Sequence, residues 1–201
     1  MDEKELLQLV ENYSKDNSDE DDIHGFGHVQ RVYQTCIKMG KKTDADLFIL
    51  RITSLLHDIG RKNNYDHEKD LNHANISAQM TRKFLTSINY EFSNTQLENI
   101  NHTIKAHSFS NQIIPKTLEA KILSDADKLD ALGAIGLYRT IGFTIKNGGN
   151  LYDVLEHLEN KIMILTNKLY LDISKEMAKK KEKIVISFYD EIKKTNDNTI
   201  I

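Results

Sequence analysis

The sequence predicts an all-α fold, in which a single domain over residues 1–201 forms a bundle of about eight helices. Its 201 residues include one proline and no tryptophan, and because proline breaks helix interiors, its scarcity favours helices. Apolar residues recur at helical spacing along most of the chain. A content of 39% hydrophobic and 28% charged residues is typical of globular proteins, and a domain of this length buries roughly 70% of its unfolded surface.

Three helices are expected in the first part of the chain. Residues 3–15 and 28–40 carry apolar residues at helical spacing, and the second of these segments ends at a glycine followed by lysines. Residues 44–58 begin with Asp44 as a candidate cap. This third segment is too apolar for a surface helix, so we expect it to be buried and to carry His57 into the interior.

The remaining helices are also expected where apolar residues recur at helical spacing. Residues 142–150 contain three glycines, so we expect a mobile loop there. Two helices should close the chain after that loop. The expected helical segments are 72–88, 93–109, 117–139 as one or two helices, 150–169 and 171–194.

Charge and cysteine content limit the classes of partner and compartment. The net charge of −3 gives no reason to expect nucleic acid as a partner. No segment resembles a signal peptide, and none approaches the roughly 20 apolar residues of a membrane helix. A single cysteine, Cys36, excludes an intramolecular disulfide. We therefore expect a cytoplasmic protein without a membrane partner; apolar residues on the last helices leave a homodimer open.

The doublet His57-Asp58 is the most informative pattern in the chain. Neighbouring residues on a helix point roughly 100° apart, but they can hold one ion if they end a helix and the chain turns there. Gly60 permits such a turn. With His28 and Asp127 the doublet offers two imidazoles and two carboxylates, a ligand set suited to Mn, Fe, Co, Ni or Zn.

These residues lie, in order, in the segments "HGFGHVQRVY", "ITSLLHDIGRK" and "LSDADKLDALGAIG". At these segments the chain resembles the HD-domain metal-dependent phosphohydrolases. The resemblance runs over about residues 24–149, with the C-terminal helices of 150–195 beyond it. It is closest to a small branch whose members are associated with hydrolysis of nucleoside triphosphates to monophosphates and pyrophosphate.

The resemblance implies the HD-domain fold and a metal held by His28, His57, Asp58 and Asp127. The motif "SDAD" offers two aspartates, and the family pattern aligns the ligand with Asp127. Asp125 would then be a cap or a residue that supports the ligands. Manganese is favoured, with nickel, cobalt, iron, zinc and magnesium as alternatives.

The other histidines divide by position. His73 and His107 resemble the places that supply a second metal in two-metal HD proteins; the alternative is that both donate hydrogen bonds to substrate phosphates around one metal. His24 is expected to line the pocket. His102 lies about 140° from His107 around a helix and is expected to be structural. His67 is expected in a solvated loop and His157 on a helix surface.

Catalysis on a polyphosphate needs cations as well as a metal. Asp58 is expected both to ligate the metal and to orient water. Arg61 is basic where some relatives place an acidic catalytic residue, so a phosphate contact is expected of it, as of Lys128 and Arg139. Arg31 could face the site or pair with a carboxylate. The loop around Gly148 and Gly149 could close over substrate.

The sequence therefore predicts a metal-dependent phosphohydrolase acting on a small-molecule nucleotide, splitting (deoxy)nucleoside triphosphates to monophosphate and pyrophosphate. One alternative is a phosphomonoesterase similar to 5′-nucleotidases, or another phosphodiester or phosphoanhydride hydrolase on the same fold. A second alternative is a sensor that binds a nucleotide without turnover. The intact set of four metal ligands argues against the sensor.

Overall fold

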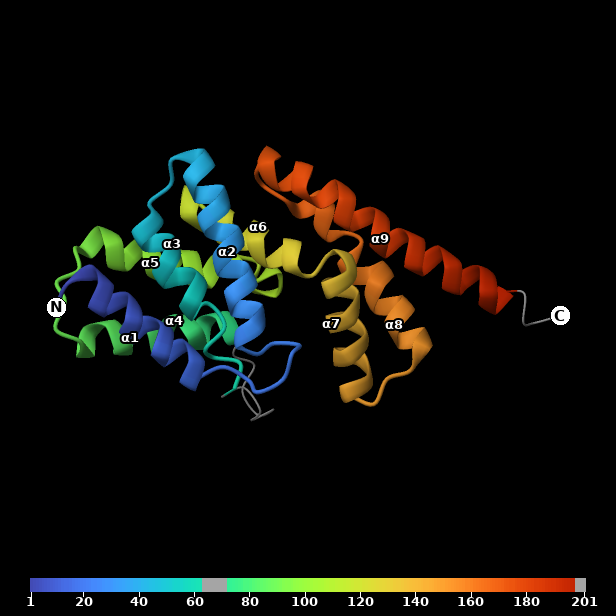
Figure 1. Ribbon diagram of the computed structural model, residues 1–201, viewed down its shortest axis with the longest axis horizontal. Helices are drawn as coiled ribbons and strands as arrows, with labels where there is room; N and C mark the ends of the chain where they lie inside the picture. The colour runs from blue at the N-terminus through green and yellow to red at the C-terminus, as the bar shows by residue number, and fades with distance from the viewer. Residues whose placement is uncertain (63–71, 198–201) are drawn as a thin grey trace. The chain divides into compact units, whose positions relative to one another are not determined.

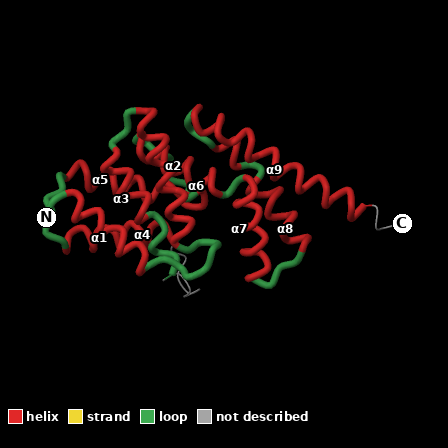
Figure 2. The backbone as a smooth tube through the Cα atoms, in the orientation of Figure 1, coloured by secondary structure: helices red, strands yellow, loops and turns green. Residues whose placement is uncertain are grey.

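The computed structural model of the protein describes residues 1–62 and 72–197 (Figure 1). His67, expected in a solvated loop, lies outside the described residues. The described residues form nine α-helices and three short helical turns, without a β-strand among them (Figure 2). The all-α prediction is confirmed, with one helix more than the eight expected. No described helix is long and apolar enough to cross a membrane.

The chain divides into two compact units, residues 1–127 and 128–201. The boundary falls inside the helix α6 (Leu118–Asp130). The expectation that residues 1–201 act as a single domain stays a prediction. The other helices of the first unit are α1 (Glu3–Asp16), α2 (Phe26–Thr43), α3 (Leu47–Leu56), α4 (His73–Ser87), α5 (Asn94–His107) and the short turn η1 (Phe109–Asn111).

Helix α3 is the central helix of the first unit, as its apolar sequence predicts. It packs against α1, α2, α4 and α5, and most of its side chains are buried, including Ile52 and Leu56. Its buried hydroxyls are satisfied locally, since Thr53 donates to the carbonyl of Ile49 at 2.8 Å. The hydroxyl of Ser14 on α1 donates to the carbonyl of Leu55 and so ties α1 to α3.

The boundary between α2 and α3 differs from the prediction. Helix α2 does not end at Gly40 but continues to Thr43. A Cβ atom on Gly40 would lie 2.5 Å from Leu50 Cδ1, so this glycine permits the close approach of α3 rather than ending α2. Asp44 then ends α2 in the left-handed conformation, with φ 57°. Asp46, not Asp44, caps α3, accepting from two backbone amides.

The second unit contains the last residues of α6 and two main helices, α7 (Gly133–Lys146) and α9 (Asp172–Asp197), which pack against each other. The mobile loop expected over 142–150 is wrong in part, because α7 continues to Lys146 and buries Thr144. Only 147–150 connect it to the next helix.

The first closing helix also differs from the prediction. In place of one helix over 150–169, the chain forms α8 (Leu151–His157), a π-helical turn η2 (Leu158–Ile162) and a 3-10 turn η3 (Leu165–Lys168). Apolar residues on all three pieces are buried, among them Val154, Leu158, Ile162 and Leu165. Burial therefore follows the predicted apolar residues although the helix is interrupted.

Candidate metal centre

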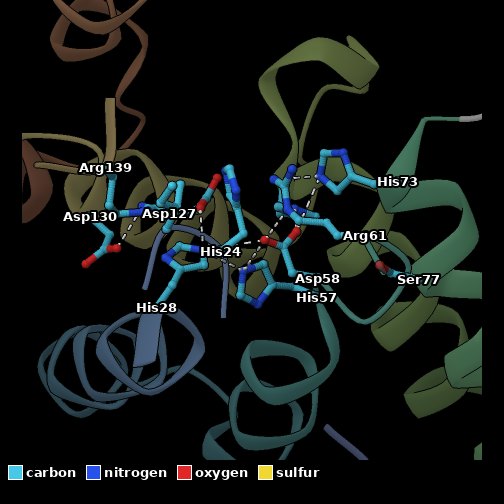
Figure 3. Close-up of polar contacts among 12 residues, drawn as sticks. His24, His28, His57, Asp58, Arg61, His73, Ser77, Asp127, Asp130 and Arg139 are labelled. Carbon is cyan, nitrogen blue, oxygen red and sulfur yellow. Dashed lines mark hydrogen bonds and ion pairs between the residues drawn. The ribbon is translucent and has the colours of Figure 1, made fainter. Parts of the chain in front are cut away.

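The doublet lies where α3 ends, as predicted. His57 is the residue directly after α3 and begins the turn that follows, in which Asp58 is the second residue. His28 lies in the first turn of α2, and all three side chains are buried. His57 Nε2 is 3.3 Å from His28 Nε2, and Asp58 Oδ2 is 3.5 Å from His28 Nε2 and 3.7 Å from His57 Nε2 (Figure 3). Three ligand atoms therefore converge on one point.

Asp127 joins this group from α6. Its Oδ1 lies 3.4 Å from His28 Nε2. Although burial by itself would raise the pKa of Asp127, the His28 imidazole holds it well below the usual range, so the carboxylate is charged. Asp125 is fully buried in the middle of α6, so the idea that it caps a helix is wrong. His28, His57 and Asp58 thus form one cluster of ligand atoms, and Asp127 adjoins it through His28.

A second pair of imidazoles lies near the other carboxylate oxygen of Asp58, Oδ1. His73, the first residue of α4, and His107, the last of α5, each place Nε2 3.4 Å from Asp58 Oδ1 (Figure 3 draws His73). Both atoms of the Asp58–His107 approach, Oδ1 and Nε2, are buried without a hydrogen-bond partner among the described protein atoms. Asp58 therefore lies between two imidazole pairs, with one oxygen toward each.

Backbone carbonyls set the orientation of two of these histidines. Nδ1 of His57 donates to the carbonyl of Ser54 at 2.8 Å, and Nδ1 of His107 donates to the carbonyl of Ile104 at 2.6 Å. A carbonyl only accepts, so the proton resides on Nδ1 in each ring. The lone pair of each Nε2 then points to the centre, which is the arrangement that metal-binding histidines adopt.

Burial also keeps two of the imidazoles, those of His57 and His73, neutral. It lowers the pKa of His57 to about 4, against the opposing charge of Asp58. Burial and the Arg61 cation lower the pKa of His73 to about 3. Asp58 behaves in the opposite way: burial favours its neutral form, but Arg61 and His57 outweigh burial and hold its pKa well below the usual range. Neutral imidazoles and charged carboxylates are the protonation states that bind a divalent ion.

The separations fit a divalent ion. Ligand atoms held at about 2.1 Å from one ion lie roughly 3.0–3.4 Å from each other, close to the 3.3–3.7 Å among His28, His57 and Asp58. Imidazole with carboxylate is a donor set for Mn, Fe, Co, Ni or Zn. Asp58 Oδ1 and His107 Nε2, both without a hydrogen-bond partner among the described protein atoms, form a second group of ligand atoms with His73.

Arg61 lies directly against the doublet. Its Nε is 2.5 Å from Asp58 Oδ2, and its guanidinium is 3.2 Å from His73 Nε2. The side chain is 27% exposed. The sequence prediction that Arg61 belongs to the site agrees with this position, whereas its role as a phosphate contact stays a prediction.

Gly60 connects the doublet to α4. A Cβ atom there would lie 2.6 Å from Ser77 N and 2.7 Å from His73 O, so only glycine allows this approach. The backbone amide of Gly60 donates to Ser77 Oγ at 2.9 Å. Sequence reasoning missed Ser77; the only signal was its place four residues after His73, on the same helix face.

The remaining histidines of the first unit lie as follows. His24 precedes α2, its backbone amide donates to Asp21 Oδ1 at 2.9 Å, and Figure 3 draws it among the site residues. His102 Nε2 accepts from the backbone amide of Lys116 at 2.8 Å, which agrees with a structural role. Arg31 is half-buried one turn after His28, and its part in substrate binding stays a prediction, as does that of His24.

Three predicted residues belong to the second unit. Lys128 is buried with its ammonium 5.2 Å from the ring centre of Tyr170. Arg139 is buried and donates to Asp130 at 2.8 Å (Figure 3). The Arg139 cation therefore already has a carboxylate partner. The substrate roles expected of both cations stay predictions. His157 ends α8 half-buried, edge-on to Phe143.

The predicted closing loop around the glycine pair is short. Gly148 has φ +81° and ends α7, and the backbone amide of Gly149 donates to the carbonyl of Thr144 at 2.9 Å. Its closure over substrate stays a prediction.

The similarity to known proteins covers the segment that contains the site residues. The model of the HD domain matches residues 25–132, more than half of the chain. YpgQ of Bacillus subtilis is 25% identical over 185 residues, which are 88% of this chain and 86% of YpgQ. Its crystal structure in complex with ADP superposes with a TM-score of 0.73 at 21% identity, covering 97% of each chain.

Two further crystal structures share the fold. A protein from Lactobacillus plantarum gives a TM-score of 0.81 at 23% identity, over 98% of this chain and all of that one. An HD-superfamily hydrolase from Bacillus thuringiensis gives 0.73 at 22%, over 98% and 99%. With the matched segment spanning all four predicted metal ligands, the chain belongs to the HD domain family, the family of metal-dependent phosphohydrolases that its motif residues predict.

Proposed function

We propose that this protein hydrolyses nucleotides with a divalent metal ion, and that it splits (deoxy)nucleoside triphosphates into a monophosphate and pyrophosphate. In this reaction water adds to the α-phosphorus, and the bond from that phosphorus to the oxygen bridging to the β-phosphate breaks. Atoms balance with one water consumed per triphosphate.

One observation carries the proposal. Asp58 is a buried, charged carboxylate with one oxygen toward His28 and His57 and the other toward His73 and His107. Apolar packing does not explain four imidazoles around one carboxylate, whereas a site that binds a divalent ion for phosphate hydrolysis does. When bound, a divalent ion acidifies water and offsets the negative charge of a phosphate.

The choice of a nucleotide as substrate draws on a relative. The crystal structure of B. subtilis YpgQ contains ADP, a phosphoanhydride of the class that the proposal names. YpgQ matches nearly the whole chain, so the same class of ligand is the first to test here.

The protein residues have distinct parts in this proposal. Asp127 completes the first ligand group beside His28. Arg61 already lies at the carboxylate, and a phosphate that approaches Asp58 meets its guanidinium, so Arg61 is proposed to bind substrate. Lys128 is proposed as a further phosphate contact. Asp58 is proposed to orient the attacking water in addition to binding metal.

We further propose that His73 and His107 bind a second ion together with Asp58 Oδ1. The alternative, hydrogen bonds from both rings to phosphate, requires protons on Nε2. The carbonyl of Ile104 holds the proton of His107 on Nδ1 instead, which favours the ion. Manganese is the proposed metal, since the ligand set mixes imidazole and carboxylate. The single cysteine, Cys36, which is buried, supports the proposal of a cytoplasmic location.

The test is the identity of the product. Purified protein loaded with Mn²⁺ is incubated with a panel of ribo- and deoxyribonucleoside mono-, di- and triphosphates, and pyrophosphate and orthophosphate are measured separately. Pyrophosphate from triphosphates supports the proposal. Orthophosphate from monophosphates would replace it with a 5′-nucleotidase, and binding without product would replace it with a sensor. His157→Gln, a histidine substitution in the other unit, is the matched control and should retain activity.

A further inference from the structure

Hydrogen bonds between side chains tie the start of α4 to the segment that follows α5. Asn75 and Asn111 form a reciprocal pair of amides: Asn75 Nδ2 donates to Asn111 Oδ1 at 3.1 Å, and Asn111 Nδ2 donates to Asn75 Oδ1 at 3.3 Å. Asn72 Nδ2 adds a hydrogen bond of 2.9 Å to Ser110 Oγ. The two segments are therefore joined at two points, both through asparagine side chains.

These links lie beside the two histidines of the second ligand group. His73 is the first residue of α4, with one linking asparagine directly before it and the other two residues after it. His107 is the last residue of α5, four residues before Asn111. Nε2 of each histidine lies 3.4 Å from Asp58 Oδ1, and the two ring centres lie 5.4 Å apart. The links therefore join the two pieces of chain that carry these rings.

Asn111 is also fixed to its own side of the pair. Its Nδ2 donates to the carbonyl of Lys105 at 2.8 Å. Lys105 is among the last four residues of α5, whose carbonyls have no amide of the same helix to accept from. An asparagine side chain has two N–H donors and an acceptor oxygen, and Asn111 uses both donors and the oxygen. It therefore connects the end of α5 directly to the first turn of α4.

Another face of α4 is anchored to the turn that carries Asp58. The amide of Gly60 donates to Ser77 Oγ at 2.9 Å, and Ser77 lies two residues after Asn75, roughly 200° further around the helix. This anchor fixes the start of α4, and with it His73, relative to Asp58. The distance from His73 to the other histidine of the group then depends on the amide pair.

We propose that the amide pair of Asn75 and Asn111 sets the separation of His73 and His107, and with it the affinity for the second ion. This inference rests on the proposed function, in which that ion binds His73, His107 and Asp58 Oδ1. Both asparagines act as positioning residues and not as ligands. A ring nitrogen bonds to a metal ion at about 2.1 Å, so a small shift of α4 relative to α5 weakens the bond. Residues that hold ligands in place typically contribute roughly ten- to a hundredfold to metal affinity.

The experiment measures the affinity for each ion without any nucleotide. Full-length wild type and Asn111→Ala are titrated with Mn²⁺, and free and bound ion are followed by EPR. Two Mn²⁺ ions that share the Asp58 carboxylate are magnetically coupled, so double occupancy has its own EPR signal. Asn111→Ala should bind the first ion as wild type does and the second roughly tenfold more weakly, with loss of the coupled signal at concentrations at which wild type shows it. Asn75→Ala should give the same result, and the double variant should add little, because each change removes the same pair.

Asn99→Ala is the matched control. Asn99 is also a half-buried asparagine, on α5, and its side chain donates to Glu119 at 3.0 Å and accepts from two threonines. It lies eight residues before His107, roughly 12 Å along the helix. Asn99→Ala should lower stability in urea unfolding without changing the affinity for either ion. If Asn111 had a purely structural role, Asn111→Ala would behave in the same way. If Asn111→Ala does not fold, Asn75→Ala replaces it.

Three results would overturn the proposal. They are a single ion in the wild type, an unchanged affinity for the second ion in both Asn111→Ala and Asn75→Ala, and an equal loss of affinity for both ions. The last two results leave the binding of two ions intact, so failure of the amide pair is distinguishable from failure of the second metal site. Because no nucleotide is added, the outcome does not depend on whether the protein hydrolyses triphosphates.

Discussion

Asp58 Oδ2 and Arg61 Nε lie 2.5 Å apart, three residues from each other in the chain. The carboxylate is 2% exposed and is also the residue that both imidazole pairs approach. Without a divalent ion, Arg61 is thus the principal positive charge that compensates Asp58. A bound metal ion and Arg61 would therefore stabilise the same buried carboxylate, so the stability that depends on Arg61 should change when metal binds.

Replacement of Arg61 by alanine should destabilise the metal-free protein more than the metal-loaded protein. Removing the cation leaves Asp58 buried with less compensation, which for this partly exposed pair costs about 1–3 kcal/mol. A bound ion restores the compensation. Urea unfolding of wild type and Arg61→Ala with and without Mn²⁺ measures the difference, and Arg51→Ala, which removes an exposed pair with Glu3, is the control. Equal losses in both states would contradict the shared role.

Replacement of Asp58 by alanine should abolish both bound metal and turnover. The variant removes both oxygens between the imidazole pairs but leaves the apolar residues of α3 in place. Helicity should therefore remain close to wild type. Metal analysis, product assay and circular dichroism of the same preparation check the three parts, and full activity of Asp58→Ala would disprove the metal site.

Replacement of His73 by glutamine should distinguish a site that binds one metal ion from a site that binds two. If two ions bind, His73→Gln should lower the content from two per chain toward one, because His73 contacts only Asp58 Oδ1 of the shared carboxylate. His28→Gln should instead remove the ion bound by the first group of ligands, His28, His57 and Asp58. Elemental analysis at saturating Mn²⁺ gives the counts. A single ion in wild type and in His73→Gln would favour a phosphate-binding role for that ring.

The metal-free protein should lose stability as the pH falls from about 6.5 toward 4. The pKa of His57 is about 4 in the folded protein and about 6.5 in an unfolded chain. Between these values the unfolded chain binds more protons, so stability rises with pH and is fully present above about 6.5. His73, with its pKa lowered to about 3, acts in the same direction.

Since one pKa unit corresponds to about 1.4 kcal/mol, His57 and His73 should each contribute on the order of 3 kcal/mol to this loss. The pKa values of Asp58 and Asp127 lie below the usual aspartate range, so these carboxyls add to the slope only below about pH 5, where aspartates of the unfolded chain begin to bind protons. Denaturant unfolding at several pH values measures it. His57→Gln should show a shallower dependence, and an unchanged slope in that variant would assign the effect to other groups.

Replacement of Gly60 by alanine should reduce stability by about 1–3 kcal/mol and weaken metal binding. The new Cβ would collide with the backbone of α4 at Ser77 and His73, and the collision pushes His73 from Asp58. Gly27→Ala is the control, because its nearest neighbour is 3.6 Å away on the flexible Arg31 side chain. Thermal unfolding and Mn²⁺ titration of both variants test the contrast.

The sequence predicts the elements that depend on local pattern. The apolar run before His57 predicts a buried helix that ends at the doublet, and α3 does so. The sequence predicts a helix boundary less well where one residue type can serve either as a helix end or as a packing contact. Gly40 carries the signal of a helix end, but it permits contact with Leu50, and the displaced boundary moves the cap from Asp44 to Asp46. Such contacts depend on residues distant in the chain.

In the site, too, the residues of the local motif could be predicted, whereas contacts between distant segments could not. The ordered motif predicts His28, His57, Asp58 and Asp127, and the structure clusters the first three, with Asp127 beside His28. It does not predict that Arg61 pairs with Asp58 or that Ser77 receives the amide of Gly60, because both contacts require the turn after α3 to pack on α4.

His57 lies directly after the end of α3 and His107 is the last residue of α5, and in each the ring Nδ1 donates to the carbonyl three residues earlier. The last carbonyls of a helix have no amide of their own to accept from. A histidine at such a position obtains its tautomer and direction from its own segment, without help from a distant residue. For protein design, helix ends of this kind are transferable modules: two of them facing one carboxylate would supply oriented nitrogen ligands on a new scaffold.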